Sequence, residues 1–109
     1  MKPLVTYDEF AKMDFRVGKI ILAEKKEGSE KLLRLKVNFG EEGERNILSG
    51  IAQWFTPEEL IDKLFVFIIN LEPRMIMGEA SEGMILAADG ETPSPLTPSS
   101  EVLPGSFIR

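Results

Sequence analysis

The side chains best suited to chemistry gather in one short stretch, NLEPRMIMGEASEGM at residues 70–84. Arg74 is an isolated cation there, and a guanidinium suits planar contacts with phosphates or base edges. The amide of Asn70 can hold a turn or read a base edge. Ser81 and Met84 bring a hydroxyl and a soft apolar side chain to the start of the next apolar run. This chemistry fits a binding loop and a packed structural loop equally well.

A second group of polar residues lies within the run LRLKVNF at residues 33–39. Arg34, Lys36 and Asn38 alternate with apolar residues, so they share the polar face of a predicted strand. A basic strand face can track a nucleic-acid backbone, but it is also typical of any exposed amphipathic strand. Lys31 stands just before this strand. It suits a phosphate contact, although its spacing alone favours an ordinary solvent-exposed lysine.

Catalytic chemistry has few candidate residues in this chain. Cysteine and histidine are both absent, which removes the thiolate nucleophile, the commonest general base and the commonest metal ligand. The sequence has no phosphate-binding glycine loop of the Walker type. The acidic residues fall in predicted turns and helix starts. We therefore expect a protein that is not an enzyme and that uses no cofactor and no metal.

The charge of the chain is unevenly distributed. The net charge is −5, which argues mildly against a nucleic-acid partner. Through Trp54 there are ten Lys and Arg against nine Asp and Glu, whereas from Phe55 onward there are three against nine. The basic residues concentrate between Arg16 and Arg45. On charge alone, a mixed solvated surface is the favoured interpretation.

No segment predicts a membrane span or an export signal. The longest apolar run, Leu64 to Ile69, is far shorter than the roughly 20 residues that a spanning helix needs. The first ten residues contain no apolar core of a signal peptide. We expect a cytoplasmic protein with no membrane partner.

The periodicity predicts an all-β domain that spans residues 1–109. Five short strands are expected, with a hairpin turn at 40–43 between the second and the third: 15–24, 33–39, 45–50, 64–69 and 83–88. This number of strands fits the small five-stranded oligonucleotide/oligosaccharide-binding (OB) barrel.

Two capping boxes predict short helices outside the strands. TYDE at 6–9 and TPEE at 56–59 each place a threonine three residues before a glutamate. Before the second helix, Trp54 and Phe55 suit a hydrophobic staple better than a base-stacking platform. The first helix is expected to end near residue 13 and to turn three side chains inward: Tyr7, Phe10 and Ala11.

The last part of the chain is rich in proline, serine and threonine, yet it regains apolar residues. A disordered tail has no need of such residues. We expect the barrel to occupy about residues 14–89 and the extension at 90–109 to cover the barrel or to meet a second subunit. The apolar residues of the extension are Leu96, Val102, Leu103, Phe107 and Ile108.

Five motifs in order make the chain resemble a known family. The resemblance is to the tRNA-binding domain at the C-terminus of many bacterial methionyl-tRNA synthetases. This domain is also found as a free-standing beta subunit, as a structure-specific tRNA-binding protein and in a cytokine-like synthetase cofactor. The motifs are DFRVGKI (14–20), SEKLLRLKV (29–37), ILSGIAQWFTPEEL (47–60), NLEPR (70–74) and SEGMILAAD (81–89).

The resemblance implies an OB barrel whose C-terminal extension forms a homodimer. It also implies non-catalytic binding to the outside corner of tRNA, in support of a methionyl-tRNA synthetase. Matched to the family motifs, the implied contacts are Lys31, Asn70, Arg74, Ser81 and Met84, and we add Arg34 and Lys36 from the basic strand face.

The chain departs from the family pattern at Met75, where a second basic residue is common. Arg45, or the pair Lys25 and Lys26, is expected to compensate for the missing charge. An export-related peptide-binding chaperone of the same superfamily remains an alternative, as does a domain that only assembles a synthetase. The initial Met-Lys-Pro favours a free-standing protein.

Overall fold

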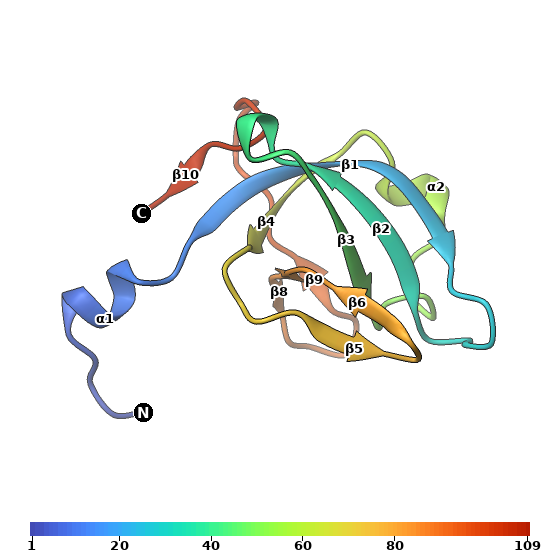
Figure 1. Cartoon of the computed structure of the whole chain (residues 1–109), viewed down its shortest axis with the longest axis horizontal. Helices are drawn as coiled ribbons and strands as arrows, with labels where there is room; N and C mark the ends of the chain where they lie inside the picture. Colours follow the sequence, from blue (N-terminus) through green and yellow to red (C-terminus); the bar gives the residue numbers. More distant parts are fainter.

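The longest strand, β1 (Phe15–Lys25), pairs with three other strands. The computed structural model describes all 109 residues. In it, β1 runs antiparallel to β4 (Leu64–Ile68) over its first half and to β2 (Leu33–Asn38) over its second half. At its start, β1 also pairs with β10 (Phe107–Ile108). β1 therefore joins both halves of the sheet to the end of the chain (Figure 1).

The main sheet curls into a nearly closed barrel. β3 (Glu44–Ser49) lies beside β2, and β7 (Met84–Ile85) lies beside β4, which gives the order β3-β2-β1-β4-β7. The two ends of this order meet, because the N–H of Glu82 donates to the carbonyl of Asn46 over 2.8 Å. The prediction of an all-β OB barrel is confirmed.

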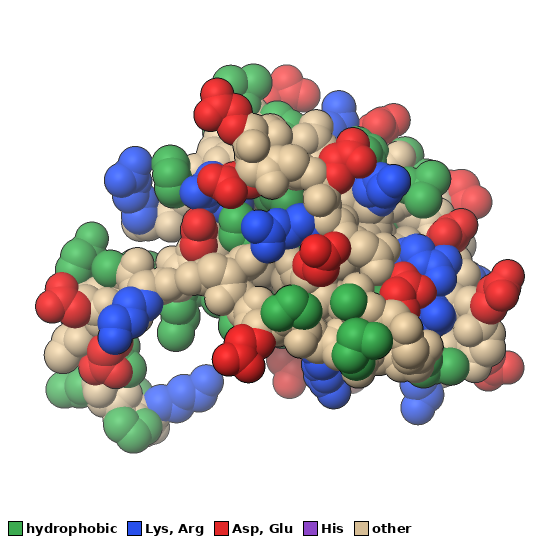
Figure 2. All heavy atoms as spheres, in the orientation of Figure 1, with side chains coloured by type: hydrophobic (Ala, Val, Ile, Leu, Met, Phe, Trp, Pro, Cys, Tyr) green, Lys and Arg blue, Asp and Glu red, His purple; other side chains and the backbone are tan.

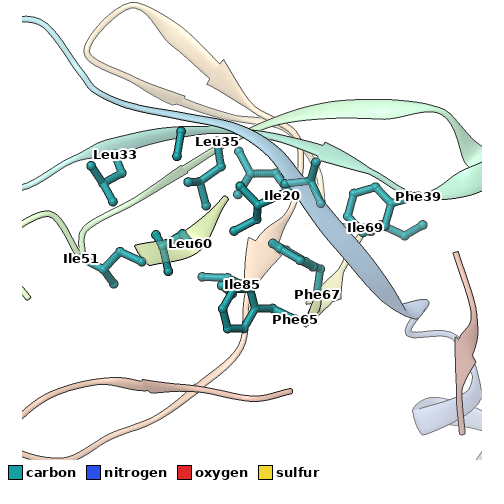
Figure 3. Packing of buried hydrophobic residues seen from close by; sticks show 13 residues of the cluster. Ile20, Leu33, Leu35, Phe39, Ile51, Leu60, Phe65, Phe67, Ile69 and Ile85 are labelled. Atoms are coloured by element: carbon teal, nitrogen blue, oxygen red, sulfur yellow. The ribbon is translucent and has the colours of Figure 1, made fainter. Parts of the chain in front are cut away.

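The core is built from buried apolar residues of the strands, which alternate strictly with outward-facing residues in β2. In β2, Leu33, Leu35 and Val37 are fully buried, while the residues between them face outward. Phe39 meets Phe67 edge to face, with ring centroids 5.3 Å apart. Each fully buried side chain of this kind contributes about 1.5–3 kcal/mol. Figure 3 shows the cluster, whose labelled members are Ile20, Leu33, Leu35, Phe39, Ile51, Leu60, Phe65, Phe67, Ile69 and Ile85.

Helix α2 (Pro57–Leu60) packs on the barrel as the sequence suggests. The carboxylate of Glu59 accepts hydrogen bonds from the N–H and the hydroxyl of Thr56, both at 3.0 Å. These bonds hold the pKa of Glu59 below its usual value. Leu60 is buried, and Phe55 packs against the core while Trp54 stays 44% exposed.

Helix α1 (Tyr7–Ala11) does not pack on the barrel. Its capping box forms, since Thr6 and Glu9 exchange hydrogen bonds of 3.1 Å. The predicted inward face is wrong, because the helix has no buried residue. The segment before β1 instead carries α1 away from the barrel (Figure 1).

The segment after β4 also differs from the prediction. Residues expected to form a loop build a hairpin of β5 (Arg74–Ile76) and β6 (Glu79–Ser81). Its two-residue turn is Met77-Gly78, with φ of 49° and 80°. Asn-Gly or Gly-Gly is the usual sequence for such a turn. Met-Gly does not match it, so the sequence does not predict this hairpin.

The expected strand at residues 83–88 is divided in two. β7 belongs to the barrel, whereas β8 (Ala87–Ala88) pairs with β9 (Ser94–Pro95) in the extension. The N–H of Leu96 donates to Leu86, and its carbonyl accepts from Val66, both over 2.9 Å. The extension therefore lies along the barrel. The expected hairpin between β2 and β3 forms, and a short 3-10 helix at Gly40–Glu42 makes its turn.

Gly18 is a required glycine in β1. A Cβ at this position would lie 2.5 Å from Phe39 Cε1 and from Val37 Cγ1, and both residues are fully buried. We predict that Gly18→Ala lowers the free energy of unfolding by about 1–3 kcal/mol, the usual cost of overpacking. Urea denaturation measures the loss. Gly50→Ala is the control, because a Cβ there meets nothing within 4 Å; equal losses in the two variants would contradict the argument.

Candidate functional site

A pocket of about 460 Å³ lies between the β5–β6 hairpin and the end of the barrel. It brings together three of the eight predicted contact residues: Arg74, Ser81 and Met84. A larger pocket, of about 600 Å³, lies between α2 and the extension, and none of the eight lines it. The residues around the smaller pocket are Leu48, Leu71, Glu72, Arg74, Ile76, Ser81, Gly83 and Met84.

Ser81 shapes the pocket from within. The residue is only 5% exposed, and its hydroxyl accepts the N–H of Leu48 at 3.0 Å. It donates to the carbonyl of Gly83 at 3.3 Å, which uses its only proton. Ser81 thus fastens the hairpin to β3 beside the closure of the barrel.

Of the three predicted contact residues at the pocket, Arg74 and Met84 are the accessible ones. Arg74 is exposed and makes no ion pair with an acidic side chain within 4.0 Å. Met84 is 48% exposed. An uncompensated guanidinium beside apolar walls can meet a phosphate while the methionine contacts a flat or apolar group.

Hydrophobic side chains gather on the surface at this hairpin. Figure 2 shows them over the part of the molecule where Figure 1 places β5 and β6, with acidic and basic side chains interspersed around them. Exposed apolar residues here include Leu71, Met75 and Met77. The opening of the barrel therefore presents an apolar patch with an interrupted charged rim.

Arg34 is engaged within the protein. Its Nε and Nη2 donate to the two carboxylate oxygens of Glu79, both over 2.6 Å, and its Nη1 donates to Glu24 over 2.8 Å. The hydrogen bond with Glu79, followed by that with Glu24, raises the pKa of Arg34. This guanidinium joins β2 to β6, so its charge is largely compensated.

Glu79 has three side-chain partners within the protein. In addition to Arg34, it accepts from Asn46 Nδ2 at 2.8 Å and pairs with Lys26 Nζ at 3.0 Å. The hydrogen bonds from Arg34, then Asn46, then Lys26 hold the pKa of Glu79 far below its usual range. No motif or spacing in the sequence marks Glu79 as a site residue. The only signal for it is the charge distribution, because basic residues concentrate in the first half of the chain and the second half is acidic.

Lys31 and Lys36 remain available on the surface. Lys31 is exposed in the loop after β1, and this loop lies near the hairpin, because Met77 Cε is 3.5 Å from where a Cβ of Gly28 would stand. Lys36 is about half exposed, with only a 3.9 Å ion pair to Glu44. Both ammonium groups can reach an external anion.

Arg45 and Asn70 are used in internal hydrogen bonds. Arg45 Nη1 donates to the carbonyl of Ile69 over 2.6 Å. Asn70 accepts the N–H of Asp14 at 2.8 Å and donates to the carbonyl of Lys12 at 2.6 Å. Neither residue lines the pocket; each ties neighbouring segments of the chain together.

No group of three or more acidic side chains is arranged to hold a metal ion. No helix is long and apolar enough to cross a membrane.

Comparison with protein families gives a match over most of the chain. The family model described as "Putative tRNA binding domain" matches residues 15–106. This range contains the barrel, the hairpin and nearly all of the extension.

Curated relatives are similar over almost the whole of this chain. The methionine–tRNA ligase of Methanocella arvoryzae is 49% identical over 107 residues, covering 98% of this chain and 16% of that protein. The methionine–tRNA ligase of Thermotoga maritima is 47% identical over 105 residues, covering 95% and 16%. The chain thus spans about a sixth of the length of these relatives.

Solved structures of about the same length as this chain have the same fold. A MetRS-related protein from Pyrococcus horikoshii superposes with a TM-score of 0.91 at 37% identity, covering 99% of this chain and 100% of that one. The chaperone CsaA from Bacillus anthracis also gives 0.91, at 29% identity, covering 98% and 100%.

The ion pairs of Glu79 predict a specific dependence of stability on pH. Because folding lowers the pKa of Glu79, its ionised form stabilises the fold above its usual pKa of 4.5, and this contribution is lost as the pH falls toward the lowered value. We expect the stability of the wild type to fall as the pH is lowered from about 5 to about 2. The stability of Glu79→Gln should fall less steeply over the same range. Urea midpoints across this range measure both slopes.

Glu44→Gln is the control for the loss of one negative charge, since its ion pair with Lys36 is 3.9 Å long. Parallel curves for Glu79→Gln and the wild type would show that Glu79 is not linked to folding.

Proposed function

This chain belongs to the tRNA-binding domain family, and from that premise we propose that it is a non-catalytic tRNA-binding protein that supports the attachment of methionine to tRNA. The match over residues 15–106 carries this proposal. The chain binds the outside corner of folded tRNA by shape and charge, and thereby raises the affinity of a synthetase for its tRNA.

The proposed contact surface has an accessible part and a supporting part. Arg74, Lys31 and Lys36 meet phosphates, because they are exposed and have weak ion pairs or none. Met84 contacts a base or ribose at the pocket. The other four predicted residues, Arg34, Arg45, Asn70 and Ser81, hold this surface in shape through the hydrogen bonds described above.

The proposed protein partner is a methionine–tRNA ligase catalytic chain. The support is that the relatives with this name are about six times as long and contain a region similar to nearly all of this chain. Such a partnership takes place in the cytoplasm, where tRNA is aminoacylated.

We also propose that the chain forms a homodimer through α1 and β10. These two elements project from the same side of the barrel (Figure 1), and a five-residue helix is not stable without packing. Tyr7 and Phe10 are exposed in α1, Met13 is exposed just after it, and Phe107 is 61% exposed in β10. A second copy of this chain would cover the apolar surface that the first copy leaves open.

The dimer predicts a mass of twice the 12.2 kDa of the chain. We expect Phe10→Asp to give a monomer, because a charge in an apolar interface is costly to bury. Light scattering after size exclusion measures the mass. Leu22→Asp, at an exposed leucine in β1, is the control and keeps the dimer. A monomeric wild type would remove this part of the proposal.

The tRNA-binding proposal is tested by the dependence of affinity on salt. Bulk tRNA is bound at several salt concentrations, with single-stranded and double-stranded RNA as competitors. The log–log slope changes by about 0.7–0.9 for each phosphate neutralised. We expect Arg74→Ala and Lys31→Ala each to reduce the slope by roughly one phosphate.

Lys63→Ala is the matched control, since Lys63 lines the larger pocket beside α2. It is expected to leave the slope unchanged. An unchanged slope in Arg74→Ala would exclude Arg74 from the phosphate contacts.

A peptide-binding chaperone is the second candidate, favoured by the similarity to CsaA and by the apolar walls of the pocket. That function would use Leu71, Ile76 and Met84 and would be nearly insensitive to salt. If the wild type binds no RNA but binds apolar peptides, this alternative replaces the tRNA-binding proposal.

A further inference from the structure

Glu79 attaches the β5–β6 hairpin to the rest of the barrel through its side chain, in addition to the bond between Ser81 and Leu48. Its carboxylate contacts Arg34 of β2 twice at 2.6 Å, Asn46 of β3 at 2.8 Å and Lys26, just after β1, at 3.0 Å. Two barrel strands and the residue that follows a third therefore converge on one side chain of β6. The side chains of Glu79 and Arg34 are only 21% and 26% exposed, so water screens this pair less than a surface pair.

The hairpin depends on such an external attachment. Its strands have three residues each, and they form a two-stranded sheet apart from the main one. An isolated two-stranded hairpin is marginally stable at best in water. Its turn also holds Met77 at φ 49°, a conformation that a methionine rarely adopts. The arrangement therefore persists because contacts outside the hairpin enforce it.

The hairpin also carries the proposed tRNA contacts. Arg74 lies in β5 directly opposite Ser81 of β6, and Ile76 lies opposite Glu79. Arg74 and Ile76 line the pocket. Any displacement of β6 therefore moves both the free guanidinium and one apolar wall of the pocket.

We propose that Glu79 is a positioning residue for tRNA binding: its carboxylate clamps the β5–β6 hairpin to β2, to β3 and to Lys26 just after β1, so that Arg74 and the pocket face the RNA. This role rests on the proposed function, because it concerns the same site. It assigns an acidic residue a favourable part in binding a polyanion.

The sign of the effect distinguishes this role from a simple electrostatic one. A carboxylate beside a phosphate-binding surface repels RNA, so removing it should tighten binding if nothing else changes. An RNA phosphate that took the place of Glu79 on Arg34 and Lys26 would give the same result. If Glu79 is a clamp, its removal weakens RNA binding instead, because the hairpin is released.

The test measures tRNA affinity of Glu79→Gln, Glu79→Asp and Glu44→Gln at one salt concentration. We expect Glu79→Gln to weaken binding roughly tenfold, although it removes a negative charge. Glu79→Asp keeps the charge and shortens the side chain, so it weakens binding as well. Glu44→Gln, with a 3.9 Å ion pair in β3, leaves binding unchanged or slightly tighter. Equal or tighter binding by Glu79→Gln overturns the proposal.

A double-mutant cycle separates positioning from general destabilisation. If Glu79 acts through the hairpin, Arg74→Ala costs less affinity in the Glu79→Gln background than in the wild type. If the two losses simply add, Glu79 does not position Arg74, and the proposal fails.

Hydrogen exchange without RNA tests the clamp by itself. We expect Glu79→Gln to accelerate exchange of the β5–β6 amides and to leave those of β1 and β2 unchanged. Unchanged exchange at the hairpin overturns the clamp. Failure of the wild type to bind any tRNA instead defeats the proposed function, and the exchange result still decides whether Glu79 holds the hairpin.

Discussion

The pairing of β1 with β2, β4 and β10 is the constraint on which the rest of this structure depends. One strand can serve three partners because β4 pairs along one edge of its first half, while β10 and then β2 pair along the other edge. The register with β2 shifts between Ile20 and Leu22. Such an irregularity bends a strand and increases its twist. At Gly18 the absence of a side chain lets Phe39 and Val37 fill the barrel interior. Closure of the barrel and docking of the chain end are therefore both set within one eleven-residue strand.

The same strand places both ends of the chain on one side. Arg16 is 8% exposed; it pairs with Asp14 at 2.6 Å, donates to the carbonyl of Gly105 at 3.2 Å and lies 3.8 Å from the ring centroid of Phe107. A buried guanidinium needs all these partners to offset the loss of water. Because they come from both ends of the chain, Arg16 fixes the base of the surface proposed for the dimer.

Several charged side chains of this protein make internal hydrogen bonds and ion pairs that hold the fold together. Arg34 and Arg45, both candidates for RNA contact by sequence, donate to groups of the protein itself at 2.6 Å. Few cations near the pocket lack an acidic partner, and Arg74 is the one that lines the pocket itself. A net charge of −5 is compatible with tRNA binding under these conditions, because a small number of well-placed cations acts at short range while the remaining charges are screened.

The sequence by itself determined the barrel, because strand alternation, buried apolar runs and capping boxes are local patterns. Residues 33–38 alternate as expected, and the Thr6 and Thr56 boxes form where predicted. Only the tertiary structure decided which polar residues are free. Arg34 and Glu79 are 45 residues apart in sequence, and no local pattern reveals that closure of the barrel brings them within 2.6 Å. The hairpin turn at Met77 and the unpacked α1 depend on contacts outside their own segments, and this is why periodicity alone misjudged both.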